Sequence, residues 1–79
     1  MPHLWKIYVI MFEFTREEYE QIVKKAMLNE ELAKIFEMKI LNYSITKISI
    51  EMNMSESTVN RRIKQLKKKI MKVIWQKIA

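Results

Sequence analysis

The basic side chains of this 79-residue chain are concentrated in its last third, where almost no acidic side chain accompanies them. Residues 56 to 79 contain eight lysines or arginines and one glutamate, whereas residues 1 to 55 contain seven basic and eight acidic side chains. The net charge of +6 therefore comes from the C-terminal segment. A nearly neutral body with one basic segment is typical of a nucleic-acid binder. The alternative is a solvated helix face that lysines keep soluble.

Other chemistries have few residues to support them. The chain has no cysteine and a single histidine, His3, so it offers neither a disulfide framework nor a cluster of the usual metal ligands. Glycine is absent, which excludes a glycine-rich phosphate loop and a nucleophile elbow. No nucleophile is expected beside a base. The sequence therefore predicts a protein that is not an enzyme and uses no cofactor and no metal.

The basic segment overlaps a pattern of two helices joined by a tight turn, from Ser44 to Ile70. Ser44 is a candidate N-cap, and the apolar residues after it recur at helical spacing: Ile45, Ile48 and Met52. Asn53 tolerates the positive φ that such a turn needs, and Ser55 is a second candidate N-cap. The next helix has one apolar face, made of Val59, Ile63, Leu66, Ile70 and Val73. Two helices with a three-residue turn form a helix-turn-helix, whose second helix enters the DNA major groove.

The stretch SESTVNRRIKQLKKKI, residues 55 to 70, resembles the recognition-helix half of the motif shared by sigma-factor region four and LuxR-type regulators. The resemblance rests on a Ser-x-x-Thr-Val start, a basic pair and a basic run between apolar positions: Ser55, Thr58, Val59, Arg61, Arg62, Ile63, Leu66, Lys67 to Lys69 and Ile70. Upstream, Ser49, Met52 and Asn53 stand where these families usually have Ala, Leu and Gly. The resemblance covers roughly residues 32 to 70 and implies a DNA-binding regulator of a bacterium or phage.

Side chains that read bases are expected opposite the apolar face of the second helix, at ~100° per residue. Arginine pairs well with guanine, and asparagine or glutamine with adenine. The predicted base readers are Ser57, Asn60, Arg61, Lys64 and Gln65. Predicted contacts to the DNA backbone come from the starts and flanks of both helices: Ser44, Thr46, Lys47, Ser55, Thr58, Arg62, Lys67, Lys68 and Lys69. The alternative for Arg62 is an ion pair with Glu51 or Glu37, and for Lys68 and Lys69 it is plain solvation.

A further helix is predicted to begin after Thr15. Thr15 and Glu18 have the spacing of a capping box, and Phe14 and Tyr19 have that of a hydrophobic staple. We expect this helix to run to about Leu28 with one face inward, made of Tyr19, Ile22, Val23, Ala26 and Met27.

Another helix is predicted to begin after Asn29, its candidate N-cap, with acidic residues in its first turn. Its core face should consist of Leu32, Ile35, Phe36 and Ile40. Asn42 is expected to end it in the left-handed conformation, where other chains often have glycine.

We therefore predict an all-α fold of four helices, with residues 14 to 79 as one helix-turn-helix domain and a long basic C-terminal helix over about residues 56 to 77. Residues 1 to 13 are expected to be a strand or an arm, because LWKIYVIMF is rich in β-branched and aromatic residues. This run is too short to cross a membrane. Apolar residues also continue beyond Ile70: Met71, Val73, Ile74, Trp75 and Ile78. They either form a partner surface or fold back on the N-terminal helix.

The predicted function is sequence-specific binding of double-stranded DNA by a cytoplasmic transcription regulator that has no membrane partner. A homodimer is expected, because two-fold pairing doubles the DNA contacts and sets the half-site spacing. Two alternatives stay open. One is a sigma-like module that binds RNA polymerase. The other is a basic amphipathic protein at a membrane surface.

Overall fold

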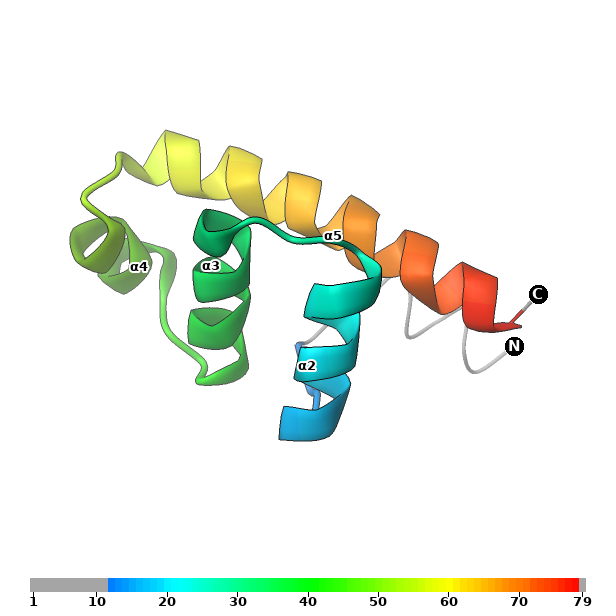
Figure 1. Cartoon of the computed structure of the whole chain (residues 1–79). Coiled ribbons are helices and arrows are strands. Elements are labelled where there is room, and N and C mark those ends of the chain that lie inside the picture. The colour runs from blue at the N-terminus through cyan, green and yellow to red at the C-terminus, as the bar shows by residue number, and fades with distance from the viewer. Residues whose placement is uncertain (1–11, 79) are drawn as a thin grey trace.

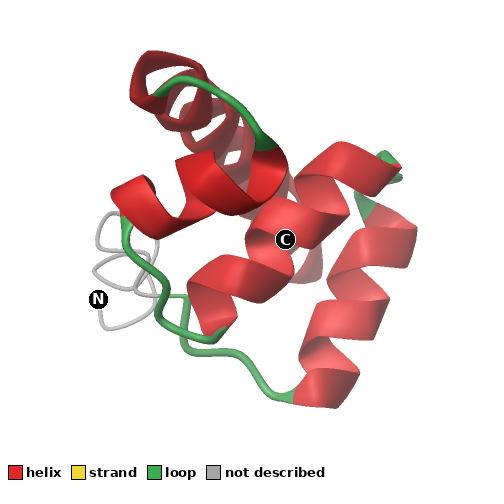
Figure 2. Cartoon of the chain, turned by 90° about the vertical axis from the view of Figure 1, so that its left-hand side faces the viewer, coloured by secondary structure: helices red, strands yellow, loops and turns green. Residues whose placement is uncertain are grey.

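The computed structural model describes residues 12 to 78, which form four α-helices in the order α2 (Arg16–Lys25), α3 (Glu30–Ile40), α4 (Ile45–Met52) and α5 (Glu56–Ile78). The described part of the chain contains no strand, so the predicted all-α fold of four helices is confirmed. Most of the predicted strand or arm at residues 1 to 13 lies outside the described residues. Short loops connect the helices (Figure 2).

α5 is the longest element, and the three shorter helices pack along one side of it. Figure 1 shows α4, α3 and α2 arranged in turn along its length. The predicted end of this helix, about Lys77, agrees with the observed end at Ile78. Its apolar residues Ile70 and Val73 are buried in one core with Ile22 of α2, so the tail at least to this point packs against the N-terminal helix, as one of the two alternatives predicted. It does so as part of one continuous helix.

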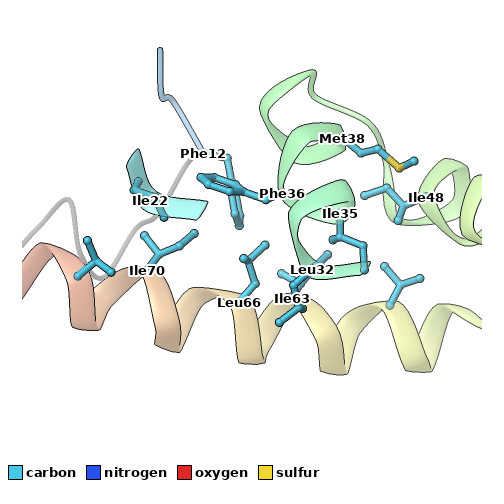
Figure 3. Close-up of a cluster of buried hydrophobic side chains, with 12 residues drawn as sticks. Phe12, Ile22, Leu32, Ile35, Phe36, Met38, Ile48, Ile63, Leu66 and Ile70 are labelled. Atoms are coloured by element: carbon cyan, nitrogen blue, oxygen red, sulfur yellow. The ribbon is translucent and has the colours of Figure 1, made fainter. Parts of the chain in front are cut away.

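The core lies between α5 and the shorter helices (Figure 3). Its fully buried side chains come from three helices: Ile35, Phe36, Ile48, Val59, Leu66 and Ile70. Phe36 is the centre of an aromatic cluster, with ring centroids 6.0 Å from Phe12, 5.6 Å from Phe14 and 5.1 Å from Tyr19. The predicted staple residues Phe14 and Tyr19 thus meet on the same buried ring, which fixes the start of α2 against α3.

The predicted helix starts are confirmed. Thr15 and Glu18 form a complete capping box, in which each side chain accepts a hydrogen bond from the backbone N–H of the other. The Asn29 side chain accepts from the Leu32 N–H at 2.8 Å. The core face predicted for α3 is buried except at Ile40, which is only partly covered, and Met38 is buried in addition.

The predicted end of α2 is wrong. The helix ends at Lys25 rather than about Leu28, and Met27, expected to point inward, has φ of 52° and is 85% exposed. Helical spacing of apolar residues continues through this point, but the backbone must reverse in order to reach the Asn29 cap. A left-handed residue makes that reversal, and it turns the Met27 side chain out to solvent.

Candidate nucleic-acid interface

The turn between α4 and α5 has the geometry that the sequence predicts. Asn53 lies in the left-handed region with φ of 56° and ψ of 47°, and the Met54 N–H donates to the Ser49 carbonyl at 2.9 Å. Asn53, Met54 and Ser55 therefore form a three-residue connection. The Ser55 hydroxyl accepts from the Thr58 N–H at 3.1 Å, so Ser55 caps α5 as expected.

Packing fixes the two helices of the motif relative to each other. Ile48 of α4 and Val59 of α5 are both fully buried. Ser49 is small enough to lie in the same contact, and its hydroxyl donates to the Thr46 carbonyl at 2.7 Å. Deleting buried methyl groups at such a contact typically costs a few kcal/mol. The orientation of α5 is therefore set by its apolar side.

The predicted base readers all lie on the exposed side of α5: Ser57, Asn60, Arg61, Lys64 and Gln65. Within the part of the chain that the structure describes, only Arg61 of this set has a side-chain partner, the Thr58 hydroxyl, to which its Nη2 donates at 3.4 Å. Asn60, Arg61 and Lys64 surround one shallow depression together with Ile63 and Lys67. The structure thus places Lys67, which was predicted to contact a phosphate on the flank, beside three of the residues that were predicted to read bases.

The residues at the start of α4 that were predicted to contact the DNA backbone already interact with other groups of the protein. The Ser44 hydroxyl accepts from the Lys47 N–H at 3.1 Å, which confirms the predicted cap. The Thr46 hydroxyl donates to the Glu56 carboxylate at 3.1 Å across the turn. The Lys47 ammonium lies 4.2 Å from the centroid of the Tyr43 ring, a cation–π distance that still leaves its N–H groups able to donate.

The other residues of α5 that were predicted to contact the DNA backbone fall into two groups. Ser55 and Thr58 are linked to each other, because the Ser55 hydroxyl donates to the Thr58 hydroxyl at 2.9 Å. Lys67 and Lys68 are exposed and have no side-chain partner among the described residues, whereas Lys69 is partly buried on a flank of the helix.

Arg62 makes the shortest ion pair in the described structure. Its Nε donates to the Glu31 carboxylate of α3 at 2.6 Å, and each side chain is 37% exposed. The alternative of an intramolecular ion pair is thus observed, but its partner is neither Glu51 nor Glu37; Glu37 lies 3.9 Å from Arg16 instead. Glu31 was missed because only the packing of α3 on α5 brings residues so distant in sequence together.

The pKa of Tyr19 is clearly shifted, and this residue lies away from the motif. Burial raises the pKa of the Tyr19 hydroxyl above its usual 10.0, with further upward contributions from Glu37 and Glu20 that Arg16 opposes. The hydroxyl donates to the Ala33 carbonyl at 3.2 Å, which is a structural role.

Over residues 12 to 78, no group of three His, Cys, Asp or Glu side chains is arranged to hold a metal ion. No helix there has the length and hydropathy needed to span a membrane.

Fold and site together define a helix-turn-helix domain whose second helix, α5, has an exposed basic side. Residues 25 to 70 match the family model described as Sigma-70, region 4. This match covers more than half of the chain, so the protein belongs to the sigma-70 region 4 family. No curated protein and no solved structure matches the chain. Sigma region 4 is a regulatory DNA-binding fold and not an enzyme family.

Proposed function

We propose that this protein is a transcription regulator that binds double-stranded DNA sequence-specifically by inserting α5 into the major groove. The observation that carries the proposal is the division of α5 into two faces. Its apolar face is buried from Val59 to Val73, and its opposite face presents the exposed arginine, lysines and amides described above. Arg61 is placed about one turn into the helix, where side chains of a recognition helix reach base edges.

Charge supports the same conclusion. Residues 56 to 79 carry a net charge of +7 from eight basic residues and one acidic residue. Neutralising phosphates releases counterions, so a helix of this kind gains affinity for any duplex before it reads a sequence. Discrimination is then the task of Arg61 and its neighbours Ser57, Asn60 and Lys64.

The test is selection of bound sequences from a random duplex pool by the full chain, followed by affinity measurements at several salt concentrations. We expect a motif of a few base pairs to be enriched. We also expect affinity for scrambled duplexes to be weaker and to fall with salt. A pool without any enriched motif would contradict sequence-specific recognition, even if salt-sensitive binding to all duplexes persisted.

A second candidate partner is RNA polymerase, and family membership favours it, since sigma region 4 domains bind DNA and RNA polymerase. The exposed sides of α2 and α3, on the part of the domain away from the outer side of α5, remain available for such a contact in this proposal. Co-sedimentation of the chain with core polymerase, with and without promoter DNA, tests it. Binding to polymerase without binding to any duplex would favour the interaction module over the regulator.

The membrane-surface alternative receives no support from the packing. An amphipathic helix that lies on a bilayer must offer its apolar face to lipid. In α5 that face is covered by the shorter helices at Val59, Leu66 and Ile70. Co-sedimentation with anionic vesicles provides the check, and we expect the chain to remain in the supernatant at physiological salt.

Homodimerisation and a cytoplasmic location in a bacterium or phage-infected cell complete the proposal. A dimer would place two copies of α5 on two half-sites and so double the phosphate and base contacts. Analytical ultracentrifugation with and without a selected duplex measures the stoichiometry. One chain per duplex at saturation would exclude the dimer and leave the DNA-binding proposal intact.

A further inference from the structure

We infer that the DNA-contacting surface extends beyond the helix-turn-helix to Lys72, which contacts a phosphate bordering the groove that the start of α5 enters. This inference rests on the proposed DNA binding and assigns a further residue to it. It concerns the end of α5 beyond Ile70, the last residue that the family model matches.

The first observation is a row of four cations on one face of the helix. Arg61, Lys64, Lys68 and Lys72 follow one another at intervals of three, four and four residues, which keeps them on one side of an α-helix. All four are exposed. The residues of this stretch that point the other way, Leu66, Ile70 and the adjacent Val73, are buried in the core. The side opposite the core is therefore basic from the base-reading region to Lys72.

The second observation is that the helices packed on α5 leave this side open. α5 is one uninterrupted helix from Glu56 to Ile78, and Figure 1 shows α4, α3 and α2 below its length, with no described helix above it. Lys68 and Lys72 also have no ion-pair partner among the described residues. Binding a phosphate therefore breaks no intramolecular contact of either side chain.

Length decides where along the DNA these two lysines lie. At a rise of ~1.5 Å per residue, Lys68 lies ~10 Å and Lys72 ~16 Å along the axis from Arg61. The major groove is only about 12 Å wide. A straight helix whose first turns reach base edges must therefore leave the groove near Lys68, and Lys72 then lies over the phosphates at its border. Chemistry supports this placement, because a lysine ammonium binds phosphate as a point charge and needs no bidentate geometry.

The experiment compares two single substitutions that remove the same charge. Lys72→Gln removes a cation from the end of the row on α5. Lys24→Gln removes one from α2, where Lys24 shares an exposed face with Glu17, Glu20 and Gln21. Both positions are exposed, so both variants should keep the melting temperature of the wild type. Affinities of wild type and both variants are measured for a selected and a scrambled duplex over a range of salt concentrations.

We expect Lys72→Gln to reduce the slope of log affinity against log salt by about one on both duplexes, as loss of one phosphate contact does. Lys24→Gln should leave the slope unchanged. A second arm uses selected duplexes with one phosphate at a time replaced by a neutral methylphosphonate. At one phosphate outside the base-read segment, this replacement should lower the affinity of the wild type but leave that of Lys72→Gln unchanged.

Equal slopes for Lys72→Gln and Lys24→Gln, with wild-type binding intact, would overturn this inference and leave the proposed function standing. Absence of binding by the wild type to any duplex would overturn both.

Discussion

The two helices of the motif differ in what their polar side chains already do. At the start of α4, Ser44 caps the helix, Thr46 donates to Glu56 and Lys47 lies over Tyr43. On the outer side of α5, the described structure gives Ser57, Asn60, Lys64 and Gln65 no side-chain partner. These polar groups of α4 must share or break existing interactions in order to reach a phosphate, whereas these four side chains of α5 would lose none.

This difference assigns a different task to each helix. α4 is tied to the turn and to α5 by hydrogen bonds and by the buried Ile48, so it positions the second helix. The outer side of α5 offers unpaired side chains, and in the proposed complex DNA would fix their rotamers at a cost of about 0.5–1.5 kcal/mol for each immobilised side chain. Substitutions of buried residues in α4 should therefore affect stability, and substitutions on the outer side of α5 should affect sequence preference. The following substitutions test that division.

The largest effect is expected from Ile48→Ala. Ile48 is fully buried between α4 and the core, so truncation should lower the free energy of unfolding by about 2–5 kcal/mol. Ile50→Ala is the matched control two residues away, because Ile50 is 72% exposed and should change stability by no more than about 0.5 kcal/mol. Urea denaturation of both variants measures the difference. Similar losses at the two positions would mean that α4 is not packed as described.

Arg61→Ala should weaken binding to the selected duplex by about 1–3 kcal/mol and flatten the preference at one or two base positions. Thermal stability should be unchanged, since Arg61 is exposed and its one contact, with Thr58, is long. Arg16→Ala is the control, an exposed arginine of α2 whose loss should leave the preference intact. If Arg61→Ala lowers affinity for selected and scrambled duplexes by the same factor, Arg61 contacts a phosphate and the rotation of α5 in the groove is different.

Lys67→Ala tests the border between base reading and phosphate binding on α5. Its side chain is expected to hold a phosphate, so affinity for all duplexes should fall together and the salt slope should decrease by about one. The measurement is the same salt series on selected and scrambled duplexes. Because Lys67 shares a surface depression with Asn60, Arg61 and Lys64, a selective loss on the selected duplex would instead add it to the base readers.

The smallest effect is expected from Glu31→Gln, which releases Arg62 from α3. The pair is partly exposed, so its loss should lower the free energy of unfolding by only about 0–1 kcal/mol. Freed Arg62 can reach a phosphate, and we expect tighter binding to every duplex with a salt slope steeper by up to about one. Unchanged affinity would show that Arg62 has no phosphate within reach.

The double substitution Glu31→Gln with Arg62→Gln completes that test. Removing a carboxylate near DNA also reduces repulsion, independently of Arg62. If the gain in affinity persists in the double variant, repulsion by Glu31 is its cause. If the gain disappears, the released guanidinium is its cause.

Features set by neighbours in sequence could be predicted, and features set by packing could not. The caps at Thr15, Asn29 and Ser44 and the left-handed Asn42 and Asn53 depend on residues within a few positions of one another, and all are observed. The buried side of α5 follows from helical spacing alone. The outer position of the base readers follows from it as well, although their contacts with DNA stay a prediction.

Two features needed the assembled fold. The partner of Arg62 is 31 positions away, so no local pattern distinguishes Glu31 from Glu37 or Glu51. The end of α2 was missed for a different reason: Met27 continues the apolar spacing, and nothing in the residue type marks it as left-handed. Without glycine in the chain, the usual marker of a helix end is missing at this position.

All four described residues with positive φ carry a side chain: Phe12, Met27, Asn42 and Asn53. For an ordinary residue this conformation costs roughly 1–2 kcal/mol, and asparagine tolerates it better. In the unfolded chain the same residues have the opposite effect, because they visit fewer backbone conformations than glycine and so have less entropy to lose, a gain of about 0.4–1 kcal/mol per position. The stiffness of the unfolded chain thus offsets only part of the strain in the folded turns. Part of the stability of the turn at Asn53, which orients α5, therefore comes from the lower conformational entropy of the unfolded chain, in which that turn has not formed.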